Sequence, residues 1–142
     1  MILIPIKNLA NAKLRLSAVL SPEERFALAQ SMCEDVLQTL ADWACRPAVA
    51  VVTSDSFARA LAARFGFEVI ADDENDGETS AISMATSLCG ERGASNTLVI
   101  PADIPLIEIV DLQKIVDAAP PQGSLLVTDD GGNKIWRITY KG

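Results

Sequence analysis

Residues 1–7 read MILIPIK, an unbroken aliphatic run that ends at the charge of Lys7. A run without polar alternation is typical of a strand that is buried on both faces, as in the centre of a parallel sheet. Similar runs follow at 47–53 (PAVAVVT), 67–71 and 97–100, and helix-like segments separate them. Buried strands that alternate with helices predict an α/β fold with a mostly parallel sheet and helices on both faces.

The longest helical segment carries a recognisable start signal. Ser21-Pro22-Glu23-Glu24 combines a capping serine, a proline suited to the first turn and a glutamate that closes a capping box. It predicts a helix that ends near Asp42. Further helices are predicted at 57–65, 78–92 and 107–118, and further strands at 124–128 and 134–141, the last as an edge strand or hairpin arm. With no repeat or linker, residues 1–142 are expected to form a single domain.

The composition excludes several classes of function. Hydrophobic residues make up 49% of the chain, which is enough for a sizeable core, and the formal net charge is −7. An acidic chain is unsuited to nucleic acid or to an anionic membrane surface, so neither is an expected partner. The chain has no histidine, which excludes histidine-based catalysis and zinc sites of the usual Cys/His type.

The cysteines and the N-terminal run predict the compartment. Cys33, Cys45 and Cys89 are widely spaced and form no C-x-x-C motif, so we expect small buried thiols in a reducing environment. The first aliphatic run is too short for a signal-peptide core, and no apolar stretch approaches the length of a membrane span. These features predict a soluble, cytoplasmic protein.

Candidate site residues follow the predicted strands, because ligands of parallel sheets bind outside the carboxyl ends of the strands. Lys7, Lys13 and Arg15 follow the first strand. They suit a polyphosphate, although a solvated basic loop is the alternative and the segment is not a Walker A loop. Asp103 follows the strand at 97–100. It is a candidate Mg²⁺ ligand, and a turn cap is an equally good interpretation.

The loop before the predicted helix at 78–92 is a second candidate region. Its acidic run at 72–76 is interpreted as a solvated loop rather than a metal site. Thr79 and Ser80 can hydrogen-bond a base or ribose, or they can cap the helix, and capping is the minimum role expected of Ser80.

Four blocks of the chain together resemble the 2-phospho-L-lactate guanylyltransferase family of coenzyme F-420 biosynthesis: IPIKNLANAKLRL at 4–16, LSPEERFALAQSMCEDVL at 20–37, VVTSD at 51–55 and LVIPADIPLI at 98–107. The resemblance implies a nucleotide-diphospho-sugar transferase (GT-A-like) fold. It also implies a reaction that joins GTP to 2-phospholactate, phosphoenolpyruvate or 3-phosphoglycerate and releases pyrophosphate.

The resemblance also assigns residues. It places Lys7, Lys13 and Arg15 on the nucleotide phosphates and Asp103 on Mg²⁺, which makes Lys13 and Asp103 the candidate catalytic pair. Thr79 and Ser80 fall where the family approaches the nucleoside, although this chain reads GETS at 77–80 and many members read G-L-N there.

The C-terminal part departs from the family pattern. Members carry a Gly-Thr-Gly-Thr-Asn-like segment after the strand that matches 124–127, whereas this chain reads TDDGGNKIWRITYKG at 128–142. We therefore expect an incomplete C-terminal part. This leaves open an inactive or nucleotide-binding remnant of the fold that acts through subunit interaction, and a nucleotidyltransferase with another acceptor. Trp136, Ile138 and Tyr140 alternate onto one face, which is expected to pack on the sheet or to join a second subunit in a homodimer.

Overall fold

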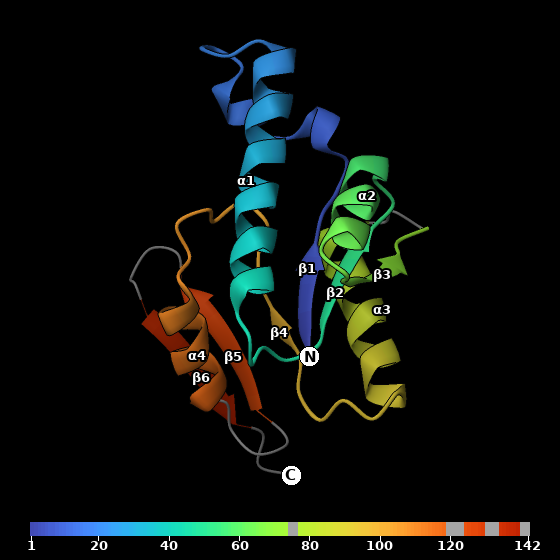
Figure 1. Ribbon diagram of the computed structural model, residues 1–142, viewed down its shortest axis with the longest axis vertical. Helices are drawn as coiled ribbons and strands as arrows, with labels where there is room; N and C mark the ends of the chain where they lie inside the picture. Colours follow the sequence, from blue (N-terminus) through green and yellow to red (C-terminus); the bar gives the residue numbers. More distant parts are fainter. Residues whose placement is uncertain (74–76, 119–123, 130–133, 140–142) are drawn as a thin grey trace. The chain divides into compact units, whose positions relative to one another are not determined.

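The computed structural model describes residues 1–73, 77–118, 124–129 and 134–139 (Figure 1). The chain divides into two compact units, Met1–Ile109 and Val110–Gly142. The first unit contains β1 (Ile2–Pro5), the 3₁₀ helices η1 (Leu9–Asn11) and η2 (Leu14–Leu16), α1 (Pro22–Asp42), β2 (Val49–Thr53), α2 (Ser56–Arg64), β3 (Glu68–Ala71), α3 (Glu78–Glu91) and β4 (Leu98–Val99).

The strands of the first unit form one parallel sheet in the order β3-β2-β1-β4. Two consecutive crossovers step from β1 to β2 and on to β3, and the next one returns past both strands to β4. Crossovers between parallel strands are right-handed, so this reversal sends α3 to the opposite face from α1 and α2. The predicted α/β sheet with helices on both faces is confirmed.

The side chains of the two central strands, β1 and β2, are buried on both faces of the sheet, which explains their aliphatic runs, whereas the outer strands β3 and β4 are only partly buried. The α3 face is covered by small residues of the helix and includes Leu3, Ala50, Val52, Ile70, Ala81, Ala85 and Cys89. Ile2, Ile4 and Val51 alternate with these strand residues and are fully buried, so they belong to the other face. The buried residues of α1 and α2 include Val36, Leu37, Leu40, Ala58, Leu61 and Ala62.

The helix starts follow local chemistry. The predicted capping box of α1 is present: Ser21 Oγ accepts a bond from the Glu24 amide at 3.2 Å, and Glu24 Oε2 accepts one from the Ser21 amide at 2.8 Å. The prediction that Ser80 caps α3 is wrong. Gly77 holds the N-cap position with φ 109°, a backbone conformation that favours glycine, and Ser80 is already the third residue of the helix.

The cysteines follow the prediction in two of three cases. Cys33 and Cys89 are buried, whereas Cys45 is exposed between α1 and β2. Cys45 lies just after Trp43, where α1 has ended and the chain turns at the surface. Among the described residues, no helix is both long and apolar enough to cross a bilayer.

The second unit contains α4 (Ile109–Asp117) except for its first residue, and an antiparallel hairpin of β5 (Ser124–Asp129) and β6 (Lys134–Thr139). The hairpin confirms that the terminal segment reverses beside the strand at 124–128, with Val127 opposite Trp136. Tyr140 lies outside the described residues, so the face predicted for Trp136, Ile138 and Tyr140 stays a prediction.

Candidate functional site

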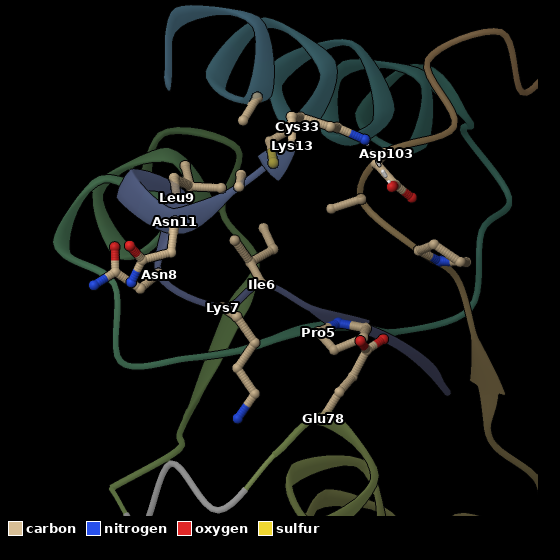
Figure 2. A pocket seen from close by; sticks show the side chains of 14 residues that line it. Pro5, Ile6, Lys7, Asn8, Leu9, Asn11, Lys13, Cys33, Glu78 and Asp103 are labelled. Atoms are coloured by element: carbon tan, nitrogen blue, oxygen red, sulfur yellow. Dashed lines mark hydrogen bonds and ion pairs between the residues drawn. The ribbon is translucent and has the colours of Figure 1, made fainter. Parts of the chain in front are cut away.

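A cavity of about 480 Å³ lies at the carboxyl ends of β1 and β4 (Figure 2). The strand order reverses between these two strands, and an open α/β sheet has its natural ligand crevice at such a point. The lining comes from residues 5–9 and 11–13, Ala29 and Cys33 of α1, Glu78 of α3, and residues 101–103 after β4.

Lys13 and Asp103, the two residues named as the candidate catalytic pair, lie together at this cavity. Lys13 Nζ donates to Asp103 Oδ2 at 2.8 Å, and Figure 2 shows this pair beside Cys33. The side chains are 22% and 58% exposed, so both groups remain accessible to a ligand. Lys13 has φ 56°, a conformation that costs energy for a residue with a side chain. Strain of this kind is typical of functional loops.

Lys7 lines the same cavity and is held by a carboxylate that the sequence analysis missed. Lys7 Nζ lies 2.5 Å from Asp72 Oδ2, and the Asp72 side chain is only 5% exposed. The interpretation of the run at 72–76 as solvated is wrong for Asp72, because its amide extends the β3 ladder by bonding to the Thr53 carbonyl at 3.4 Å. Asp73 is exposed, and residues 74–76 lie outside the described part.

Three other predicted ligand contacts lie away from the cavity lining. Arg15 is exposed in η2, and Thr79 and Ser80 are exposed in the first turn of α3. Their contacts with the nucleotide stay predictions. Glu78, which the sequence analysis did not single out, lines the cavity instead, and Figure 2 shows its side chain directed into it. The sequence signal for Glu78 was its position directly after Gly77, at the start of the helix.

Cys33 is the buried thiol of the site. The pKa of the Cys33 thiol is raised to about 11, first by burial and then by the charges of Asp103 and Asp55, with a smaller opposing effect from Lys13. The thiol is therefore protonated at neutral pH and acts as a neutral wall of the cavity.

The Asp103 carboxylate has the chemistry of a ligand for a magnesium ion that phosphates also hold. Within the part of the chain that the structure describes, no three His, Cys, Asp or Glu residues gather into a ready-made metal site. Mg²⁺ does not need such a cage, because it commonly binds one or two carboxylates together with substrate phosphates and water. The exposed Asp103 carboxylate, facing a cavity that also holds Lys7 and Lys13, meets that requirement.

Most of the chain matches a known protein family. The family described as "Guanylyl transferase CofC like" matches residues 1–135. The chain belongs to this family. Among curated relatives of this CofC-like chain, phosphoenolpyruvate guanylyltransferase of Mycobacterium leprae (strain Br4923) is 31% identical over 135 residues, covering 93% of the chain and 62% of the relative. The 2-phospho-L-lactate guanylyltransferase of Methanobrevibacter smithii is 26% identical over 130 residues, covering 92% and 57%.

The CofC-like chain therefore spans about three fifths of the length of these curated relatives. Solved structures agree with its fold. A protein from Desulfovibrio desulfuricans G20, assigned as a nucleotide-diphospho-sugar transferase, matches with a TM-score of 0.66 at 19% identity, covering 82% of the chain and 52% of that protein. CMP:2-keto-3-deoxy-manno-octonic acid synthetase complexed with CTP matches with a TM-score of 0.53 at 20% identity, covering 83% and 47%. The predicted nucleotide-diphospho-sugar transferase fold is confirmed.

Proposed function

We propose that this CofC-like chain transfers the guanylyl group of GTP to a small phosphorylated acid and releases pyrophosphate, in the biosynthesis of coenzyme F-420. The observation that carries the proposal is the meeting of Lys13 and Asp103, 2.8 Å apart, in the cavity at the reversal point of the sheet. The relatives' names give the reaction class, with phosphoenolpyruvate and 2-phospholactate as acceptors.

The two cavity lysines bind the triphosphate in this proposal. Lys7 and Lys13 each face a carboxylate in the structure, at 2.5 Å and 2.8 Å. The buried Asp72 keeps Lys7 in place, whereas the exposed Asp103 is free to exchange Lys13 for a cation. Lys13 then donates to a phosphate oxygen, where a charge-assisted hydrogen bond is strong. Arg15 extends the positive charge beyond the cavity, and Thr79 and Ser80 approach the nucleoside.

Asp103 would hold the magnesium ion, which supplies neutralisation of the charge that develops on the triphosphate. The remaining chemistry needs little from the protein. An oxygen of the acceptor's phosphate attacks the α-phosphorus, the bond from that phosphorus to the β-phosphate bridge oxygen breaks, and pyrophosphate leaves with the electron pair. The attacking phosphate is already anionic at neutral pH, so no general base is required. Catalysis then rests on positioning and electrostatic stabilisation, which suits a chain without histidine.

We also propose that the protein is soluble and works in the cytoplasm. The net charge of −7 and the unpaired cysteines fit a soluble protein of the reducing cytoplasm. A homodimer through the β6 segment remains part of the hypothesis, and measurement of the mass in solution tests it.

Pyrophosphate release tests the proposed reaction. GTP is mixed with the chain and, in turn, phosphoenolpyruvate, 2-phospholactate or 3-phosphoglycerate, with and without Mg²⁺. We expect Mg²⁺-dependent release that requires one of the acids, and much less release when ATP or CTP replaces GTP. A folded chain that binds GTP yet releases no pyrophosphate with any acid contradicts the proposal.

A further inference from the structure

Asp55 connects two segments that are far apart in the chain. One oxygen, Oδ1, accepts hydrogen bonds from the amides of Phe57 and Ala58 at 2.9 and 3.1 Å and so caps α2. The other, Oδ2, accepts a hydrogen bond from the Leu9 amide at 3.2 Å, at the start of η1. A single carboxylate therefore ties the segment after β1 to the segment after β2.

Thr53 supports this connection from within the sheet. Its side chain is fully buried, and its hydroxyl donates to the Ile6 carbonyl at 2.6 Å and accepts from the Asp55 amide at 3.0 Å. The hydroxyl thus satisfies the backbone carbonyl of Ile6, directly after the end of β1. It also fixes the backbone of Asp55, whose carboxylate then reaches Leu9.

A second attachment lies at the far end of the same segment. Arg25 of α1 is 8% exposed, and its Nη1 donates to the Ala12 carbonyl at 3.3 Å, directly before Lys13. The segment from Leu9 to Ala12 is therefore attached at both ends, once to Asp55 and once to α1. Lys7 precedes it and Lys13 follows it, and both line the cavity.

We infer that Asp55 is a positioning residue that fixes the backbone between Lys7 and Lys13 so that both ammonium groups face the cavity before the nucleotide binds. This inference rests on the proposed function and deepens it. Asp55 itself is not among the described residues that line the cavity, so it acts through the loop. A loop that is already ordered loses less conformational freedom when it binds the triphosphate, and this strengthens binding.

A purely structural role is the competing explanation, because an N-cap stabilises its helix whatever the function. Asp55→Asn separates the two roles. Asparagine keeps one acceptor oxygen, which the two α2 amides can satisfy, and it replaces the other oxygen with an amide that cannot accept from Leu9 N–H. Ser21→Ala is the matched control, since Ser21 caps α1 through Glu24 and is not among the lining residues.

Titrations with GTP and with guanosine, both with Mg²⁺, test the inference alongside thermal unfolding. We expect Asp55→Asn to weaken GTP binding about 10-fold, by the loss of one bond to a charged acceptor, and to leave guanosine binding unchanged. Ser21→Ala is expected to lower the unfolding midpoint and to bind GTP like the wild type. If Asp55→Asn does not fold, Thr53→Val removes the supporting hydroxyl, and Thr53→Ser retains it as the rescue.

Two outcomes overturn the inference without touching the proposed function. In the first, the wild type binds GTP and Asp55→Asn binds it with a Kd within about twofold of the wild-type value. The other is an equal loss of affinity for GTP and guanosine in Asp55→Asn. A folded wild type that binds no GTP refutes the proposed function itself, and this inference falls with it.

Discussion

Lys13→Gln isolates the charge that we place on the triphosphate. Glutamine is close to lysine in length and has a β-carbon, so the backbone at φ 56° carries the same strain in both proteins. The substitution removes the ammonium group that donates to Asp103 at 2.8 Å. It therefore changes one charge at the cavity and leaves the loop's attachments at Leu9 and Ala12 in place.

The size of the effect follows from the exposure of this ion pair. With side chains 22% and 58% exposed, the pair is screened by water and contributes at most about 1 kcal/mol to folding. A charge-assisted bond from Lys13 to a phosphate oxygen is worth about 1.5–3 kcal/mol. Because nucleotide binding must first break the pair with Asp103, the net loss in Lys13→Gln is about 1–2 kcal/mol, or roughly 5- to 30-fold in Kd.

Calorimetric titration with GTP and with guanosine measures this loss. We expect the Kd for GTP to rise about 5- to 30-fold. The Kd for guanosine should not change, because guanosine has no phosphates. Arg59→Gln is the matched control, since Arg59 is an exposed cation of α2 outside the cavity lining. If Lys13→Gln weakens GTP and guanosine equally, or if Arg59→Gln has the same effect, the loop does not act through a phosphate contact.

Three further predictions concern the same site. Asp103→Asn should abolish most of the gain in GTP affinity that Mg²⁺ provides. The variant should still bind metal-free GTP at least as well as the wild type, because a negative charge facing the phosphates is gone, and an unchanged Mg²⁺ dependence refutes the metal assignment. Asp72→Asn should lower the free energy of unfolding in urea by about 1–3 kcal/mol, since it removes a buried carboxylate from its ion pair with Lys7; an unchanged urea midpoint shows that the pair contributes nothing. At pH 8 iodoacetamide should modify the exposed Cys45 long before Cys33, because a pKa of about 11 leaves only about a thousandth of the Cys33 thiol ionised. The rate of Cys33 labelling should rise toward pH 10, and equal rates for the two cysteines at pH 8 contradict that pKa.

The sequence predicted the elements well where the deciding signals are local. The helix after Ser21 was predicted by its own capping box, and the structure contains both bonds of that box. The aliphatic runs predicted strands buried on both faces, because a central parallel strand has no solvent-facing side to mark with polar residues. Lys13 and Asp103 were predicted as site residues because they follow strands that end at one edge of the sheet.

The remaining features depend on tertiary neighbours that local patterns do not encode. Asp72 was grouped with an acidic run, and only the order of the sheet, in which β2 lies between β3 and β1, shows that it is buried against Lys7. Asp55 reads as an ordinary N-cap, and its second oxygen acquires a role only when η1 folds beside α2. The cap assigned to Ser80 failed because glycine can begin a helix through its own positive φ.

The most direct test of the central claim follows both products of the reaction at once. Phosphorus NMR of the chain with GTP, Mg²⁺ and phosphoenolpyruvate or 2-phospholactate separates the phosphates by their chemical environment. We expect GTP signals to decay while inorganic pyrophosphate and a pair of coupled signals from a new asymmetric diphosphate grow together, and we expect Asp103→Asn to suppress both. Persistence of the GTP signals with every acid, or their conversion to GDP and orthophosphate, contradicts the claim that this cavity transfers a guanylyl group.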